Sequence, residues 1–315
     1  MTAEELAVGL FKLRFKALGT NCLVQFRAPS IESAKKYRSE TLAWIRAFEE
    51  TWSRFRPDSL LCHINASAGI NAVKLTPQQD EIIKLCEHTF RTSKGIIDPT
   101  SYPLTELWDS AAQRDQVPEE NEIARTRESI GWDKVEHSPG SVFLPEKGMA
   151  LEIGGFGKEY AVDQLIALAR SYQIEHALVD LGRDVATLGS PVHGPYWVVG
   201  VENARELDAP LHRLAITNQA LATSGNGRRF RTIGGEKYGH IIDSRTGHPV
   251  KNELLTATCL ANDCLTAGLL STSACILGID SGMEQVDRSF NTEALFQTAT
   301  NTLFSNNIHL QLISQ

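Results

Sequence analysis

The stretch LEIGGFGKEYAVD, residues 151–163, is the most informative part of the chain for its fold. Residues 149–153, which are apolar except for Glu152, predict a strand, and the spacing of apolar residues over 158–170 predicts a helix. The glycines between them let backbone N–H groups approach a ligand closely, and a helix N-terminus carries partial positive charge. Lys158 adds a full charge. The stretch is therefore either a phosphate-binding turn or a purely structural one.

Two well-known phosphate motifs do not match this stretch. In a P-loop the lysine is followed by Ser or Thr, whereas Lys158 is followed by Glu159. In the dinucleotide motif GxGxxG, Tyr160 would occupy the position of the last glycine. The turn therefore belongs to neither class.

Three further segments each allow a structural and a functional interpretation. The segment ATSGNGRR (222–229) is either a hairpin turn with exposed arginines or an anion site made of hydroxyl and backbone donors. In GHIIDSRTG (239–247), His240 precedes a short apolar strand, where a histidine is more often structural than catalytic. The segment GIIDPTSYPL (95–104) would on its own be an ordinary proline-containing loop.

Predicted elements on either side of the glycine turn place the chain in the α+β class. We expect a strand over 13–26 interrupted at Gly19, a long helix after Ser30 and a helix over 76–93 with a capping box. Further strands are expected at 177–181, 196–202 and 256–261, and a helix at 265–277. Because no regular βαβ rhythm appears, we expect mixed or antiparallel sheets with packed helices. They would form one compact unit, or one split into two lobes.

The composition excludes several classes of function. A net charge of -7 argues against a nucleic-acid partner, because phosphate binding needs clustered Lys and Arg. No run of about 18 apolar residues and no signal peptide are present, so we expect a soluble cytoplasmic protein with no membrane partner. The six scattered cysteines are expected to be buried thiols, with no disulfide framework and no zinc site.

Taken in order, the segments resemble the ApbE-like FAD:protein FMN transferases over nearly the whole chain, which would make residues 1–315 a single flavin transferase domain. No single motif is decisive. The resemblance lies in ALGT (17–20), WSRFRPDS (52–59), DPT (98–100), PL (103–104), LW (107–108), the glycine turn with YAVD (160–163), VDLG (179–182), ATSG (222–225), HIID (240–243), TG (246–247) and AGLLST (267–272).

The resemblance implies a protein that binds FAD in an extended cleft. With Mg²⁺ it would transfer FMN to a Thr or Ser hydroxyl of a target protein and release AMP, although some relatives hydrolyse FAD to FMN and AMP instead. His240 occupies the family's histidine position and would accept the proton of the attacking hydroxyl.

The same resemblance assigns the remaining site residues. Thr272 and a backbone carbonyl of the glycine turn, at Gly157, would bind Mg²⁺. The FAD-binding residues would be Leu18 and Phe55 beside the flavin, Thr223 and Ser224 at the pyrophosphate, and Asp98, Glu152, Lys158, Asp163 and Ile241 along the rest of the cleft.

One departure from the family pattern concerns the metal directly. Family members carry Ala-Asp-Ala-Leu-x-Thr where this chain has AGLLST, so Gly268 replaces a carboxylate that binds magnesium. Because Mg²⁺ usually needs one or two carboxylates, we expect weak binding, and Asp263 is not assigned as a substitute. The glycine would make room for a water or for a bulkier neighbour such as Arg183.

Other departures are smaller: Glu159 replaces a glycine, Arg183 the second glycine of a pair, Glu152 an aspartate, Ser244 a proline and Phe55 a tyrosine. Three alternatives stay open. The chain is a working FMN transferase or FAD pyrophosphatase, a catalytically impaired or non-catalytic FAD-binding paralogue acting as carrier or regulator, or an unrelated α+β scaffold protein.

Overall fold

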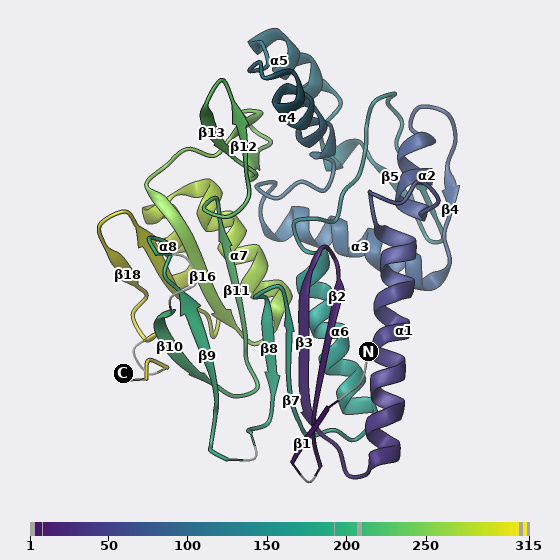
Figure 1. The fold of residues 1–315 in the computed structure, drawn as a ribbon. Helices are drawn as coiled ribbons and strands as arrows, with labels where there is room; N and C mark the ends of the chain where they lie inside the picture. The colour runs from purple at the N-terminus through teal and green to yellow at the C-terminus, as the bar shows by residue number, and fades with distance from the viewer. Residues whose placement is uncertain (1–3, 8, 192, 207–209, 309–310, 314–315) are drawn as a thin grey trace. The chain divides into compact units, whose positions relative to one another are not determined.

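The structure is a computed structural model that describes residues 4–7, 9–191, 193–206, 210–308 and 311–313. The chain divides into two compact units (Figure 1). Unit 1 comprises residues 1–49, 156–224 and 253–315, and unit 2 comprises 50–155 and 225–252. Both units combine helices with antiparallel strand pairs, so the expected α+β class is confirmed.

Unit 1 is built on a nine-stranded sheet in the order β1-β2-β3-β7-β8-β11-β16-β17-β18. A separate antiparallel pair joins β9 and β10. The strands are β1 (Glu4–Ala7), β2 (Leu10–Ala17), β3 (Thr20–Arg27), β7 (His176–Leu181), β8 (Val185–Leu188), β9 (Trp197–Glu202), β10 (Pro210–Ile216), β11 (Ala220–Gly225), β16 (Leu254–Ala261), β17 (Glu293–Thr298) and β18 (Thr302–Phe304). The helices are α1 (Ile31–Trp52), α6 (Gly157–Ser171), α7 (Cys264–Leu277) and α8 (Ile279–Asp287).

The segment expected as one interrupted strand is a β-hairpin of β2 and β3. Its two-residue turn consists of Leu18 and Gly19, both at positive φ (53° and 69°), as a type I′ turn requires. Alternate residues of β2 are buried, which fits a strand with one face on the core.

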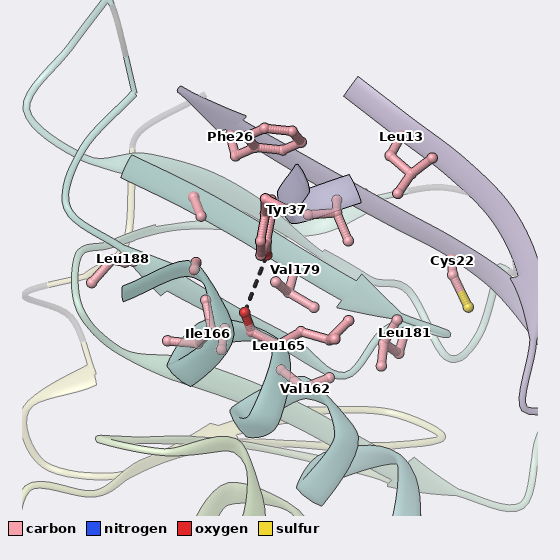
Figure 2. Packing of buried hydrophobic residues seen from close by; sticks show 14 of the residues in the cluster. Leu13, Cys22, Phe26, Tyr37, Val162, Leu165, Ile166, Val179, Leu181 and Leu188 are labelled. Atoms are coloured by element: carbon pink, nitrogen blue, oxygen red, sulfur yellow. Dashed lines mark hydrogen bonds between the residues drawn. The ribbon is translucent and has the colours of Figure 1, made fainter. Parts of the chain in front are cut away.

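The core of unit 1 lies where β2, β3 and β7 meet helices α1 and α6 (Figure 2). Phe26 packs edge-on against Tyr37, with ring centroids 4.8 Å apart. The hydroxyl of Tyr37 donates to the carbonyl oxygen of Leu165 at 3.1 Å, so the buried phenol is satisfied. This core holds the start of α6, and with it Lys158, in a fixed place.

Unit 2 contains short helices and small sheets. Helix α3 begins with the predicted capping box, in which Thr76 and Gln79 exchange side-chain and backbone hydrogen bonds. The elements are α2 (Leu60–Ala66), β4 (Val73–Lys74), α3 (Pro77–Thr92), α4 (Tyr102–Arg114), α5 (Glu120–Glu128), a 3₁₀ turn (Trp132–Lys134), β5 (Glu136–Ser138), β6 (Ser141–Phe143), β12 (Phe230–Ile233), β13 (Glu236–Gly239), β14 (Ile242–Asp243) and β15 (His248–Pro249).

The prediction of a strand over residues 149–153 is wrong. Only Ala150 forms an isolated bridge, to Ser101. The side chain of Asn65 takes the place of a neighbouring strand, because its Oδ1 accepts from the N–H of Leu151 (2.7 Å) and its Nδ2 donates to the carbonyl oxygen of Leu151 (2.9 Å). The backbone N–H and carbonyl of Leu151 are therefore hydrogen-bonded without a neighbouring strand.

The cysteines are free thiols, as expected, and Cys62 is half-buried whereas the other five are buried. Within the described part of the chain, no helix is long and apolar enough to cross a membrane.

Candidate functional site

The predicted site residues divide between the two units. Leu18, Gly157, Lys158, Asp163, Thr223, Ser224 and Thr272 belong to unit 1, whereas Phe55, Asp98, Glu152, His240 and Ile241 belong to unit 2.

In unit 1, Lys158 lies in the first turn of α6 beside two acidic side chains. Its Nζ pairs with Oδ2 of Asp184 and lies 3.8 Å from Oε1 of Glu159. Both carboxylates are buried, with exposed fractions of 2% for Asp184 and 5% for Glu159. We call these three residues the Lys158 cluster.

Burial and charge act in opposite directions in this cluster. Burial lowers the pKa of Lys158, but Glu159 and Asp184 outweigh that effect and hold the pKa above its ordinary value. Burial raises the pKa of Glu159 to about 7, against the opposing effect of Lys158. The positive charge of Lys158 is therefore already committed to carboxylates, which weakens its expected role as a phosphate ligand.

Gly268 on α7 faces the cluster. A Cβ placed on Gly268 would lie 2.5 Å from Cγ of Glu159 and 3.0 Å from its Cδ. The expectation that Gly268 makes room for a bulkier neighbour is therefore confirmed, but Arg183 as that neighbour is wrong. Arg183 forms an ion pair with Glu202 at 2.7 Å.

Two of the predicted hydroxyl residues, Ser224 and Thr272, come together in unit 1. Oγ of Ser224 on β11 lies 2.8 Å from Oγ1 of Thr272 and 2.8 Å from Oγ of Ser271 on α7. Thr223 lies apart from this group, because successive residues of a strand point to opposite faces, and it contacts Thr258 at 2.9 Å. Ser224 and Thr272 thus form a hydroxyl pair that can offer hard oxygen ligands.

Asp163 has a structural contact in unit 1. Its carboxylate accepts the backbone N–H groups of Cys264 (2.8 Å) and Leu265 (2.9 Å) at the start of α7. Burial raises the pKa of Asp163 to about 6, although both N–H groups lower it. Asp263 is the N-cap residue of the same helix and accepts from Thr266. Both aspartates therefore stabilise the beginning of α7.

Leu18 sits in the β2–β3 turn, partly buried against the core of unit 1. Its N–H donates to Oε1 of Glu49 at 2.8 Å, which holds the turn against the end of α1. Its contact with a flavin stays a prediction.

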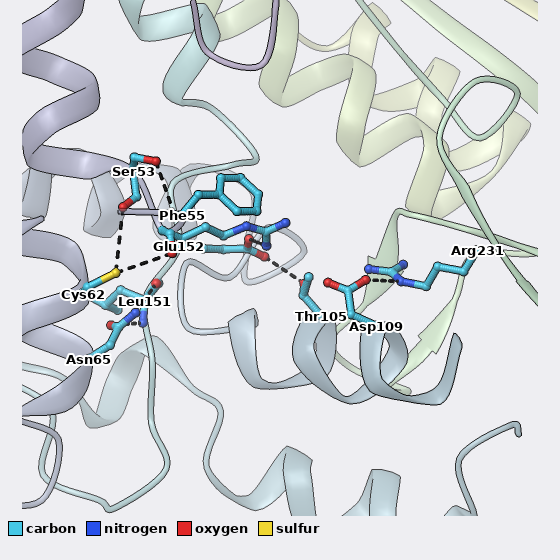
Figure 3. A network of polar contacts seen from close by, with 10 residues as sticks. Ser53, Phe55, Cys62, Asn65, Thr105, Asp109, Leu151, Glu152 and Arg231 are labelled. Atoms are coloured by element: carbon cyan, nitrogen blue, oxygen red, sulfur yellow. Dashed lines mark hydrogen bonds and ion pairs between the residues drawn. The ribbon is translucent and has the colours of Figure 1, made fainter. Parts of the chain in front are cut away.

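In unit 2, Glu152 is held in a polar network shown in Figure 3. Its Oε2 lies 2.7 Å from Nη1 of Arg54, and its Oε1 accepts from the hydroxyl of Thr105 at 3.0 Å. Burial raises the pKa of Glu152, and Arg54 opposes that rise. The neighbouring Phe55 is 80% exposed, with the guanidinium carbon of Arg54 4.8 Å from its ring centre.

Asp98 is buried in its own loop. It accepts from the N–H and the hydroxyl of Thr100 (2.8 and 2.6 Å) and from the N–H of Trp132 (3.3 Å). Burial raises its pKa, against these three donors. These contacts favour a role in shaping the loop, and a contact with FAD stays a prediction.

His240 follows strand β13 in unit 2. Its Nδ1 lies 3.0 Å from the carbonyl oxygen of Arg229, and its backbone N–H donates to the same oxygen at 3.2 Å. Because a carbonyl oxygen only accepts, Nδ1 carries the proton, and in the neutral ring Nε2 holds the lone pair that a general base needs.

Ile241 is buried, and its N–H donates to Oδ1 of Asn226 at 3.3 Å. Asn226 also fills the space beside Gly239, where an added Cβ would lie 2.2 Å from its Cγ. The loop 226–229 and the histidine segment are thereby joined within unit 2.

The sequence did not identify several residues that take part in these contacts. Glu159 was noted only as a departure, and Arg54, Asp184, Ser271 and Asn226 were not assigned roles. The sequence did contain one signal. Position 159 carries a carboxylate where the family usually has a glycine, and position 268 carries a glycine where the family has a carboxylate.

Among the described residues, no three His, Cys, Asp or Glu side chains gather in an arrangement that could hold a metal ion. Mg²⁺ differs from the metals that need such groups, because it often takes only one or two carboxylates together with waters and substrate phosphates. A cavity of about 710 Å³ in unit 1 contains none of the predicted site residues; it is lined by Arg14, Phe15, Lys16, Asn21, Cys22, Leu23 and Asp180.

Comparison with known proteins gives consistent matches. The model of the ApbE family matches residues 18–296. An FAD:protein FMN transferase of Klebsiella pneumoniae is 27% identical over 267 residues, which cover 82% of this chain and 81% of that protein. A protein of the same name from Vibrio cholerae is 26% identical over 272 residues, covering 84% and 81%.

Solved structures match along almost the entire chain. The crystal structure of the ApbE protein of Thermotoga maritima superposes with a TM-score of 0.87 at 25% identity, covering 97% of this chain and 100% of that one. The flavin transferase ApbE of Vibrio cholerae gives 0.84 at 22% identity, covering 99% and 100%, which shows a shared fold.

Proposed function

Because this chain belongs to the ApbE family, we propose that it is an FAD:protein FMN transferase. It moves FMN from FAD to a Thr or Ser hydroxyl of a target protein and releases AMP. The observation that carries the proposal is the family match over residues 18–296, which includes His240 and Thr272. We also propose that residues 1–315 make up one flavin transferase domain, which the long structural matches support.

In this reaction the hydroxyl oxygen of the target attacks the phosphorus on the FMN side of the pyrophosphate. A new P–O bond forms to the target, and the P–O bond to AMP breaks. His240 accepts the hydroxyl proton on Nε2, and its Nδ1–H bond to the carbonyl of Arg229 keeps the ring in the required tautomer. AMP leaves as the phosphate monoester.

The proposed metal is Mg²⁺, which supplies positive charge to the pyrophosphate. Thr272 and the carbonyl of Gly157 would hold it, and the Ser224 hydroxyl keeps Thr272 in place through their 2.8 Å contact. The buried Oε2 of Glu159, which has no hydrogen-bond partner among the described residues, supports the presence of a cation near these oxygens.

A second candidate is an FAD-binding paralogue that does not catalyse transfer. The specific observation in its favour is Gly268, which places no carboxylate on α7 one turn before Thr272. A cytoplasmic location stays a prediction from the sequence, and cell fractionation tests it.

The distinguishing experiment incubates the full chain with FAD, MgCl₂ and a protein extract. AMP release is measured by chromatography and flavin attached to protein by in-gel fluorescence. We expect both signals, and both should vanish with EDTA. AMP release without protein-bound flavin would indicate FAD hydrolysis. FAD binding with neither signal would favour the non-catalytic paralogue and overturn the proposal.

A further inference from the structure

Glu159 occupies the space that a side chain at position 268 would fill. A Cβ on Gly268 would lie 2.5, 3.0 and 3.1 Å from Cγ, Cδ and Oε1 of Glu159. These distances are too short for both side chains to be present without rearrangement. The carboxyl group of Glu159 on α6 therefore lies where a short acidic side chain at position 268 on α7 would place its carboxyl group.

One oxygen of the Glu159 carboxylate is left without a hydrogen-bond partner by the described residues around it. Glu159 is 5% exposed, and the oxygen in question is Oε2. Lys158 is its ion-pair partner, but at 3.8 Å, and Lys158 makes a shorter contact with Asp184. A buried carboxylate oxygen without a partner is costly, so such an atom points to a ligand that completes its surroundings.

The charges around Glu159 favour a cation as that ligand. Within the Lys158 cluster, one ammonium group faces two buried carboxylates. Negative charge is thus in excess in a place that water reaches poorly. A divalent cation would reverse the sign of this excess and balance an incoming pyrophosphate.

Hard oxygen atoms accompany Glu159 on the neighbouring helix. Thr272 follows Gly268 by four residues on α7, so the two positions share one face of the helix. The Thr272 hydroxyl in turn contacts Ser224 at 2.8 Å. Carboxylate and neutral oxygen ligands are the set that Mg²⁺ prefers.

We propose that Glu159 supplies, from helix α6, the carboxylate ligand for Mg²⁺ that Gly268 on helix α7 lacks. Glycine at 268 is then required, because it leaves space for the glutamate. The inference rests on the proposed function for the identity of the metal. Asp184 acts differently: it makes the shorter contact with Lys158.

A simpler alternative is that Glu159 only pairs with Lys158. The two roles predict opposite results for Glu159→Gln, which keeps the shape and removes the charge. If Glu159 is a metal ligand, the variant should keep or raise the melting temperature in EDTA and lose the rise that MgCl₂ causes in wild type. If Glu159 is only a partner of Lys158, the variant should melt lower in EDTA, and the MgCl₂ effect should persist.

The direct test measures Mn²⁺, a paramagnetic substitute for Mg²⁺, by electron paramagnetic resonance on the full chain, with and without FAD. We expect Glu159→Gln to weaken Mn²⁺ binding by roughly tenfold or more. The matched control is Glu175→Gln, an exposed glutamate of the same unit, which should bind Mn²⁺ as wild type does. The exchange Glu159→Gly with Gly268→Asp should recover most of the affinity that Glu159→Gly loses.

Unchanged Mn²⁺ binding in Glu159→Gln would overturn the inference, as would a wild type that binds no Mn²⁺ in either state. An exchange variant no better than Glu159→Gly would also count against it. FAD binding is followed separately by quenching of flavin fluorescence. If wild type binds Mn²⁺ through Glu159 but binds no FAD, the proposed function fails and the metal site stands.

Discussion

Arg54 forms an ion pair with Glu152 inside unit 2, with Nη1 and Oε2 2.7 Å apart and both side chains mostly removed from water. We expect Arg54→Met to destabilise the protein by about 2 kcal/mol, between the values for exposed and fully buried pairs. Urea unfolding measures the loss. It should be larger at pH 7.5 than near pH 4, because burial already raises the pKa of Glu152 and a protonated carboxyl needs no partner.

The control is Arg56→Met, which breaks the more exposed pair with Asp58 at 3.3 Å. That change should alter stability by less than about 0.5 kcal/mol. Adding Glu152→Gln to Arg54→Met should recover much of the loss. Equal losses of stability in Arg54→Met and Arg56→Met would mean that the Arg54–Glu152 pair contributes no more than an exposed ion pair.

The contact between Gly268 and Glu159 predicts that Gly268→Ala changes stability in opposite directions in the presence and in the absence of the Glu159 side chain. In wild type, Gly268→Ala should destabilise by about 1–2 kcal/mol, because overpacking exceeds the gain in helix propensity. In a Glu159→Ala background the clashing atoms are gone, and the same change should stabilise by up to about 1 kcal/mol. Urea unfolding of the four proteins gives both values. Stabilisation in both backgrounds would contradict the contact.

The same contact changes what we expect of Gly268→Asp. The sequence alone suggests that the aspartate restores a metal ligand and raises magnesium affinity. In the structure its side chain would meet Glu159, placing two carboxylates in one space. The single variant should therefore gain no affinity.

Much of the fold could be predicted from local patterns, as α3 illustrates. The sequence predicts the start of that helix from Thr76, Pro77 and Gln79, and the structure has the same capping box. The run at 149–153 could not be assigned correctly, since its backbone partner is the side chain of Asn65, far away in the chain. Periodicity contains no information on such contacts.

The candidate site was predictable where it follows a motif and not where it depends on packing. His240 and Thr272 could be proposed because the family pattern marks them, and their roles stay predictions. Glu159 appeared only as a departure, because the sequence does not show that α6 brings it against Gly268. Nor does it show that Lys158 is held by Asp184.

For ligand binding, we expect FAD to bind more tightly than FMN or riboflavin, with AMP as a competitor. The residues expected to contact FAD include positions for its flavin end, such as Phe55, and for its pyrophosphate, such as Ser224. Calorimetry with each ligand measures the order. Equal affinity for FMN and FAD would mean that the nucleotide end makes no net contribution.

Phe55→Ala provides a variant for the same measurement. The ring is 80% exposed, so its loss should scarcely change stability. If the ring packs on the flavin, FAD and FMN should each lose about 0.5–1.5 kcal/mol of binding free energy, and AMP none. Phe290→Ala is the matched control, because that ring is 85% exposed.

Asp163 should make stability depend on pH between about 4 and 6. The unfolded carboxyl has an ordinary pKa near 3.8, and burial raises the folded pKa to about 6. As the pH rises through this window, the unfolded chain releases its proton first, so stability falls by about 2–3 kcal/mol. Asp163→Asn should remove this part of the slope, as measured by urea unfolding at pH 4.5 and 7.

Asp263→Asn is the control for that experiment, because asparagine caps a helix about as well as aspartate does. It should leave the slope unchanged. A wild-type slope that survives in Asp163→Asn would mean that the two N–H groups of α7 hold the carboxylate at its ordinary pKa.

His240→Ala should abolish FMN transfer while the fold and FAD binding remain nearly intact. The ring is not part of a buried core, and water can replace its Nδ1 contact with the carbonyl of Arg229 in the variant. Loss of a general base costs on the order of 10²–10⁴ in rate, which AMP release from FAD measures. His63→Ala removes an exposed histidine of the same unit and should leave that rate unchanged. Because a missing base can be replaced from solution, added imidazole should restore part of the AMP release in His240→Ala. Full turnover without imidazole, or a loss that imidazole does not relieve, would identify His240 as a structural residue that orders the loop at Arg229.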